Sequence, residues 1–170
     1  MKRITPLLTA MSISSLLMTS AFASDLSPKF TVAIIKDIAG SSDIKNGDYH
    51  TGIKSLSRTS SASKFDKSMG LCVAYLQAKS FTSAEVACTD AITAIETHHS
   101  AGHKAKLLKA LAYSNRGIVK YFQDDEYGAL ADLSTAVMLS DDPLIVNNIN
   151  YLKISASTTL DENAFLIAAE

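Results

Sequence analysis

The stretch NRGIVKYFQDDEYGALADLSTAVMLSDDP, which spans residues 115–143, places small residues at intervals among larger apolar ones. The small residues are Gly117, Ala129 and Ala136, and aromatic and aliphatic side chains lie between them. Paired helices approach each other closely only where side chains are small, and the larger neighbours fill the remaining space. The spacing therefore predicts packed helices and does not indicate a catalytic motif.

Helix start signals occur on both sides of this stretch. Ser63 with Asp66, and Thr82 with Glu85, fit the hydroxyl-x-x-acid capping pattern, and Pro143 suits a first helical position. The pattern predicts helices near 48–58, 64–79, 82–98, 103–123, 125–139 and 143–155, with a short last helix near 162–169. Brief connections favour antiparallel neighbours. The segment FTVAII at 30–35 is the one strand candidate, and it could equally be an extended arm lying on the helices.

The spacing of the small residues resembles that of the tetratricopeptide repeat. Counted from Ala110, Gly117 is eighth, Ala129 twentieth and Ala136 twenty-seventh in a unit of roughly 34 residues, and these are the small positions of that family. An upstream copy places Cys72, Ala84 and Ala91 at the same three positions. The resemblance covers roughly residues 46 to 155. It implies an all-α fold of antiparallel helical hairpins stacked as a short right-handed superhelix, with about two recognisable repeats and degenerate flanking units.

The two cysteines lie at equal distances from the expected turn at Ser80. Cys72 precedes this residue by eight positions and Cys88 follows it by eight, so an antiparallel hairpin would bring them to the same height. Both also occupy repeat positions that face the partner helix. In an oxidising compartment we expect a Cys72–Cys88 disulfide, and the alternative is two buried free thiols.

The first residues, MKRITPLLTAMSISSLLMTSAFASD, have the organisation of a secretory signal peptide. Lys2 and Arg3 precede an apolar segment, and Ala21-Phe22-Ala23 is a small-x-small cleavage signal. We expect cleavage after Ala23, which would place the mature chain in the periplasm or outside the cell. Repeated Ser and Thr residues argue against a membrane-spanning helix, so no stable membrane insertion is expected after cleavage.

The expected organisation has four parts: a signal peptide at 1–23, an N-terminal arm at 24–45, a helical domain at 46–155, and a tail or short capping helix at 156–170. Cleavage would leave 14 Lys and Arg residues against 17 Asp and Glu residues, a net charge near −3. Nucleic-acid binding usually requires a basic face or stripe, so no nucleic-acid partner is expected.

Residues that could carry chemistry are few. Glu96, His98, His99 and His103 form the one histidine-rich patch, but Ser100-Ala101-Gly102 predicts a solvated loop between them, so we expect no metal site. The acidic run at 124–126 lies where a helix starts and favours its positive end. No nucleophile elbow, zinc-protease motif or phosphate loop is present. We therefore expect no cofactor and no catalysis. The alternative is a small envelope enzyme, or an accessory subunit, that uses the acidic or histidine-rich loops.

The resemblance implies a concave surface lined by the first helix of each hairpin. The candidate partner-binding residues on it are Met69, Val73, Leu76, Gln77, Leu111, Ser114, Asn115, Ile118, Tyr121 and Phe122. This apolar to mildly polar surface favours a scaffold that binds a protein or peptide partner. Whether the groove is open, or is covered by the N-terminal arm or an extra helix near 103–112, stays open at this point. Self-association through the open end of the array is a further hypothesis.

Overall fold

The computed structural model describes residues 29–97 and 102–167, and these residues form helices with no strand. The helices are α1 (Ser41–Lys45), α2 (Tyr49–Arg58), α3 (Lys64–Gln77), α4 (Phe81–Thr97), α5 (His103–Tyr121), α6 (Glu126–Leu139) and α7 (Pro143–Ile167). The expectation of an all-α fold is confirmed for this part of the chain. The signal peptide expected at 1–23 lies outside the described residues.

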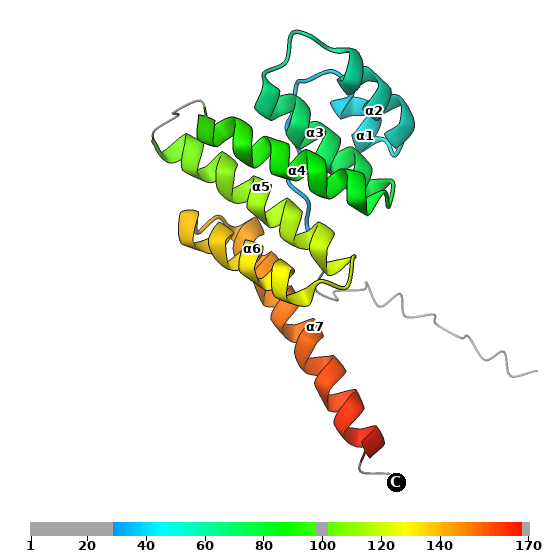
Figure 1. Cartoon of the computed structure of the whole chain (residues 1–170), viewed down its shortest axis with the longest axis vertical. Coiled ribbons are helices and arrows are strands. Elements are labelled where there is room, and N and C mark those ends of the chain that lie inside the picture. Colours follow the sequence, from blue (N-terminus) through cyan, green and yellow to red (C-terminus); the bar gives the residue numbers. More distant parts are fainter. Residues whose placement is uncertain (1–28, 98–101, 168–170) are drawn as a thin grey trace, which may run out of the picture.

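Each helix packs against the next one along the chain (Figure 1). Three alternate pairs also touch, namely α1 with α3, α3 with α5, and α5 with α7. The odd-numbered helices therefore form a continuous layer. Helix α4 packs against both α3 and α5 of this layer. The end of α7 projects well beyond the packed body (Figure 1).

The small residues of the 115–143 stretch mark the contact between α5 and α6. A Cβ atom added at Gly117 would lie 2.9 Å from Leu133 Cγ and 3.2 Å from the Ala129 carbonyl oxygen. Ala129, Leu133 and Ala136 are fully buried. A side chain at position 117 would push the two helices apart, so the packing role predicted for this glycine is confirmed.

A disulfide joins Cys72 of α3 to Cys88 of α4, as the spacing predicted. The two Cα atoms lie 4.8 Å apart, and both side chains are fully buried. The link therefore fastens one helical hairpin at its centre.

Two of the three predicted helix starts are confirmed. The Ser63 hydroxyl accepts a hydrogen bond from the Asp66 backbone N–H, and Asp142 accepts one from the Leu144 N–H just after Pro143. The start predicted at Thr82 is wrong. Helix α4 begins at Phe81, so Thr82 lies within its first turn.

The sequence pattern predicts two helices in the C-terminal segment, near 143–155 and 162–169. The structure instead has one helix, α7, which continues without a break from Pro143 to Ile167. No Gly or Pro interrupts residues 144–167. The Ser155 and Ser157 hydroxyls donate to the carbonyls of Tyr151 and Ile154, so these polar residues stay within the helix. The domain boundary expected at residue 155 falls inside α7.

The segment at 41–45, which was expected to belong to the N-terminal arm, forms the short helix α1. Gly40 precedes it with a φ of 82°, a conformation that L side chains rarely adopt. A Cβ at Gly40 would also lie 2.6 Å from the carbonyl oxygen of Gly52 in α2. This glycine allows the chain to turn tightly from the arm into the helical body.

Candidate functional site: a groove occupied by the N-terminal arm

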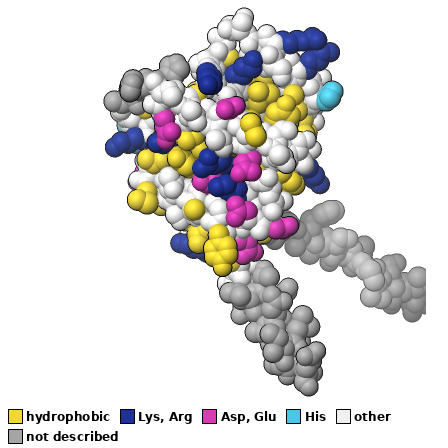
Figure 2. All heavy atoms as spheres, in the orientation of Figure 1, with side chains coloured by type: hydrophobic (Ala, Val, Ile, Leu, Met, Phe, Trp, Pro, Cys, Tyr) yellow, Lys and Arg dark blue, Asp and Glu magenta, His cyan; other side chains and the backbone are white. Residues whose placement is uncertain are grey.

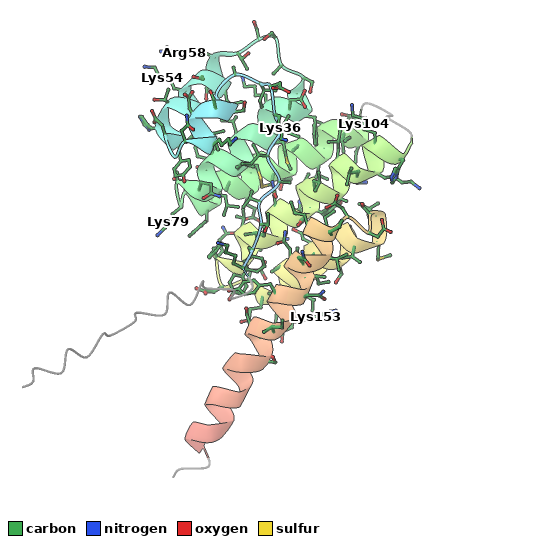
Figure 3. The ribbon with its side chains drawn as sticks, turned by 180° about the vertical axis from the view of Figure 1, so that it is seen from behind. Lys36, Lys54, Arg58, Lys79, Lys104 and Lys153 are labelled. Atoms are coloured by element: carbon green, nitrogen blue, oxygen red, sulfur yellow. A yellow bond between two sulfur atoms is a disulfide. The ribbon has the colours of Figure 1, made fainter. Side chains whose placement is uncertain are left out.

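Residues 29–36 form an arm without helical structure that lies across the layer of odd-numbered helices. Figure 3 shows this arm from behind, where it runs down the molecule from Lys36 toward α7. Of the two possibilities for FTVAII, an arm on the helices is therefore observed, and the strand is not. The apolar face of the odd-numbered helices is a groove with this arm in it.

Two buried asparagines hold the arm by its backbone. Asn115 of α5 accepts a hydrogen bond from the Ala33 N–H at 2.9 Å and donates one to the Ala33 carbonyl at 2.9 Å. Asn148 of α7 makes the same pair with Thr31, with both distances 2.8 Å. Each amide side chain thus bonds to both the N–H and the C=O of one arm residue. We call Asn115 and Asn148 the asparagine clamp.

The clamp is itself positioned by buried neighbours. The Asn148 amide also donates to the Ser114 hydroxyl at 2.9 Å, and the Asn115 amide lies 3.8 Å from the Met69 sulfur. Asn115, Asn148 and Ser114 are fully buried. Since a buried polar group without a partner is costly, the arm backbone supplies hydrogen bonds that these buried amides need.

The side chains of the arm fill apolar pockets along the groove. Phe30 makes edge contacts with Tyr121 and Tyr151, whose ring centroids lie 4.9 and 4.5 Å from its own. Val32 packs among residues of α3, and Ala33 is 6% exposed in a cluster with Met69. Thr31 and Ile34 instead face outward. The arm therefore combines backbone pairing with an inward apolar set.

Most of the predicted partner-binding residues lie beneath the arm or at its edge. Met69, Val73, Leu76, Ser114, Asn115 and Ile118 are buried, Leu111 and Tyr121 are half-buried, and Gln77 and Phe122 are exposed. The question of an open or covered groove is answered in two parts, because the buried members of this set lie under or beside the arm, while Gln77 and Phe122, at the C-terminal end of α3 and α5, stay accessible.

The accessible end is a pocket of about 560 Å³ beside the start of the arm. Its walls include Leu76, Gln77, Ile118, Tyr121 and Phe122, and Phe30 of the arm forms part of its lining. Phe122 stacks on Phe81 with ring centroids 5.6 Å apart. Pockets that bind ligands commonly have volumes of about 300–1,000 Å³, so this pocket has room for part of a bound molecule.

Sequence reasoning missed Asn148 and Tyr151, although a signal for Asn148 was present. Asn148 follows Ser114 by 34 residues, which is the period of the family that the sequence resembles, and the two side chains are hydrogen-bonded. Tyr151 lies on the same helix and contacts Phe30. Extending the count of groove positions by 34 residues past Pro143 would have included Asn148 but not Tyr151, which corresponds to Gly117.

A buried ion-pair cluster lies between α5 and α6. Arg116 makes two hydrogen bonds to the Asp132 carboxylate, at 2.7 and 2.8 Å, and Lys120 lies 3.2 Å from the same carboxylate. The hydrogen bonds that Arg116 donates to the Asp132 carboxylate raise the pKa of Arg116, although burial opposes the shift. Arg116 also lies over the Tyr113 ring. All of these charges have partners, so the cluster is best explained as a brace between the two helices.

The other candidate chemical groups do not gather into a site in the described residues. Glu96 pairs with Lys109 at 2.7 Å, His103 begins α5, and His98 and His99 lie outside the described residues. Asp125 caps α6 by accepting from the Gly128 N–H, as expected for the acidic run. Among the described side chains, those of residues 29–97 and 102–157, there is no group of three or more His, Cys, Asp or Glu placed to hold a metal ion.

Charged side chains lie on both faces of the body. Figure 2 shows the face opposite the arm, where acidic and basic side chains lie close together. On the arm side, Lys79, Lys104 and Lys153 lie around the edges of the helical layer (Figure 3). None of the helices in the described part of the chain has the length and apolar character needed to cross a bilayer.

Comparison of the chain with protein-family models, with curated proteins and with solved structures finds no match.

Proposed function

We propose that this protein is a non-catalytic, tetratricopeptide-like scaffold of the periplasm or the cell exterior that binds a protein or peptide partner through its concave helical surface. In this proposal the hairpins α3–α4 and α5–α6 are the two recognisable repeats, and α7 is the first helix of a degenerate third unit. The contacts of α3 with α5 and of α5 with α7 support this stacking, since first helices of successive repeats line one side of such an array.

The observation that carries the proposal is the arm in its groove. The groove holds an extended segment through backbone hydrogen bonds and apolar pockets, and these are the two components by which proteins bind extended peptides. The pocket of about 560 Å³ extends this surface beyond the arm. The Cys72–Cys88 disulfide supports an oxidising compartment.

The test is affinity capture with variants at two exposed aromatic residues. Phe122 is 48% exposed and lines the pocket, whereas Tyr127 is 91% exposed on α6 and is absent from the pocket lining. We expect proteins retained from an envelope extract by the unaltered chain to be lost with Phe122→Ala and kept with Tyr127→Ala. Equal retention by all three proteins would place the contact elsewhere and refute the groove as the binding surface.

Export is tested separately from binding. Mass measurement of the protein from the periplasmic or extracellular fraction should give an N-terminus at Ser24 and no free thiols. An uncleaved chain in the cytoplasm with two alkylable cysteines would contradict the proposed location.

A further inference from the structure

We propose that the arm is an exchangeable occupant of the groove, and that the partner is a protein segment that displaces it by matching its backbone edge and apolar pattern. The partner class is an extended segment with an aromatic residue, then an aliphatic residue two positions later, a small residue next to that, and a further aliphatic residue two positions beyond. This inference rests on the proposed function and names the ligand and the regulation of the same groove.

The first step of the argument is that the clamp contacts only one edge of the arm. Asn148 pairs with Thr31 and Asn115 pairs with Ala33, and these residues are two apart. In an extended chain, the N–H and C=O groups of alternate residues point to the same side. Every extended peptide presents such an edge, so the clamp itself does not select a sequence. Another segment can therefore replace the arm without any change in the asparagines.

Selectivity comes instead from the pockets beside the clamp. Phe30 meets Tyr121 and Tyr151, and Val32 packs against α3. Ala33 lies in the buried cluster that contains Met69 and Ala112, so this position requires a small side chain. Ile35 packs at the edge of the same cluster. The segment 30–35 of the chain is therefore a template for the ligand.

The arm must also compete with the ligand, because both need the same clamp. The arm joins α1 through residues 37–40, where Asp37 has a φ of 63° and Gly40 a φ of 82°. A segment tethered this closely acts at an effective concentration on the order of millimolar. The apparent affinity for a free segment is reduced by the fraction of molecules with the arm detached. A chain with its arm released should therefore bind a ligand far more tightly than the closed chain.

The experiment uses a synthetic peptide with the sequence of residues 29–36, KFTVAIIK, blocked at both ends and labelled with a fluorophore. The arm is released in the mature chain by Ala33→Asp, which places a carboxylate in the buried cluster. Ile34→Asp is the matched control. It adds the same charge at the neighbouring position, but the Ile34 side chain is 41% exposed. We expect the peptide to bind Ala33→Asp at least about a hundredfold more tightly than the unaltered chain or Ile34→Asp.

Backbone recognition is tested by N-methylation, which removes one amide donor from the peptide. The amide of Ala33 pairs with Asn115, whereas Ile34 is not one of the two arm residues, Thr31 and Ala33, to which the clamp bonds. Methylation at Ala33 should weaken binding about tenfold or more, and methylation at Ile34 should weaken it less than threefold. Equal losses from the two methylations, or no binding to a folded Ala33→Asp protein, would overturn the inference.

A second measurement covers the case in which Ala33→Asp does not fold. Hydrogen exchange of the unaltered chain is followed with excess peptide, and the Ala33 amide of the chain should exchange faster as the peptide displaces the arm. No change at saturating peptide would overturn the inference. The two proposals can fail separately. If the peptide binds but no partner depends on Phe122, the exchange of the arm is supported and the proposed function is refuted. If a partner is captured through Phe122 but the peptide does not bind, the proposed function is supported and the exchange of the arm is refuted.

Discussion

Replacement of Asn115 by alanine tests the contact on which the groove depends. The side chain is fully buried and makes two hydrogen bonds to Ala33, which is itself only 6% exposed. Asn115→Ala removes both bonds and leaves the Ala33 N–H and C=O without these partners. A buried group left unpaired costs about 1–3 kcal/mol. Two such groups give an expected loss of about 2–6 kcal/mol in the free energy of unfolding.

The arm can limit this loss by leaving the groove. Once it detaches, water satisfies the Ala33 backbone, so the cost cannot exceed the free energy with which the arm is docked. Asn148→Ala acts on the same arm, and Thr31, its partner, is exposed, so we expect a smaller loss of about 1–2 kcal/mol. If either substitution releases the arm, the double variant should lose less than the sum of the two single losses.

The assay is chemical denaturation of the mature chain, together with limited proteolysis at Lys29 and Lys36 of the arm. Asn147→Ala and Asn150→Ala are the controls, because both asparagines are exposed on α7 and neither should change stability by more than about 0.5 kcal/mol. Asn115→Ala with the stability of these controls and an arm still resistant to protease would refute the argument that the clamp holds the arm.

Three further substitutions test the helical body. Serine at both Cys72 and Cys88 should lower the free energy of unfolding by about 3 kcal/mol, and a reductant should destabilise the unaltered chain but not this variant. Asp132→Ala leaves Arg116 and Lys120 without their shared carboxylate, and because both cations are partly exposed we expect a loss of about 2–4 kcal/mol, against little change for the exposed Asp90→Ala. Gly117→Ala gains about 1 kcal/mol in helix propensity but places a Cβ 2.9 Å from Leu133 Cγ, so denaturation should show a net loss of about 1–2 kcal/mol; a more stable variant would contradict close packing there.

The features that the sequence predicted well depend on local spacing. The Cys72–Cys88 pairing follows from the symmetry of one hairpin, and the burial of Ala129 and Ala136 follows from helical periodicity. Caps such as Ser63 involve residues only three positions apart. Each of these contacts is specified within a short segment, so the pattern of side chains along the chain carries the information.

The position of the arm could not be predicted in the same way. Asn115 is 82 residues from Ala33, and Asn148 is 117 residues from Thr31. The groups of the arm that bond to the clamp are backbone N–H and C=O, and every residue except proline has both. No side chain in the segment 30–35 therefore indicates that the two asparagines bind it. The apolar character of FTVAII showed that the segment should be buried, but not on which helices.

The continuity of α7 was missed for a different reason. Serine and threonine residues at 155–159 have weak helix propensity, and this favoured a break. In the structure, hydroxyl groups bond back to carbonyls of the preceding turn, which these residues can do without leaving the helix. Propensity alone could not decide between these outcomes.

Arm docking and partner binding draw on the same groove, so substitutions on the two sides of it have different consequences. A change in the clamp, such as Asn115→Ala, weakens the hold on the arm and on any segment that replaces it. A change in the arm, such as Ala33→Asp, weakens only the resident segment and leaves the clamp intact. Both changes cost stability, since both remove the docked arm, yet one should lower ligand affinity while the other raises it. A groove that served only to complete the hydrophobic core would give no such divergence, because every loss of arm docking would then have the same single effect, on folding.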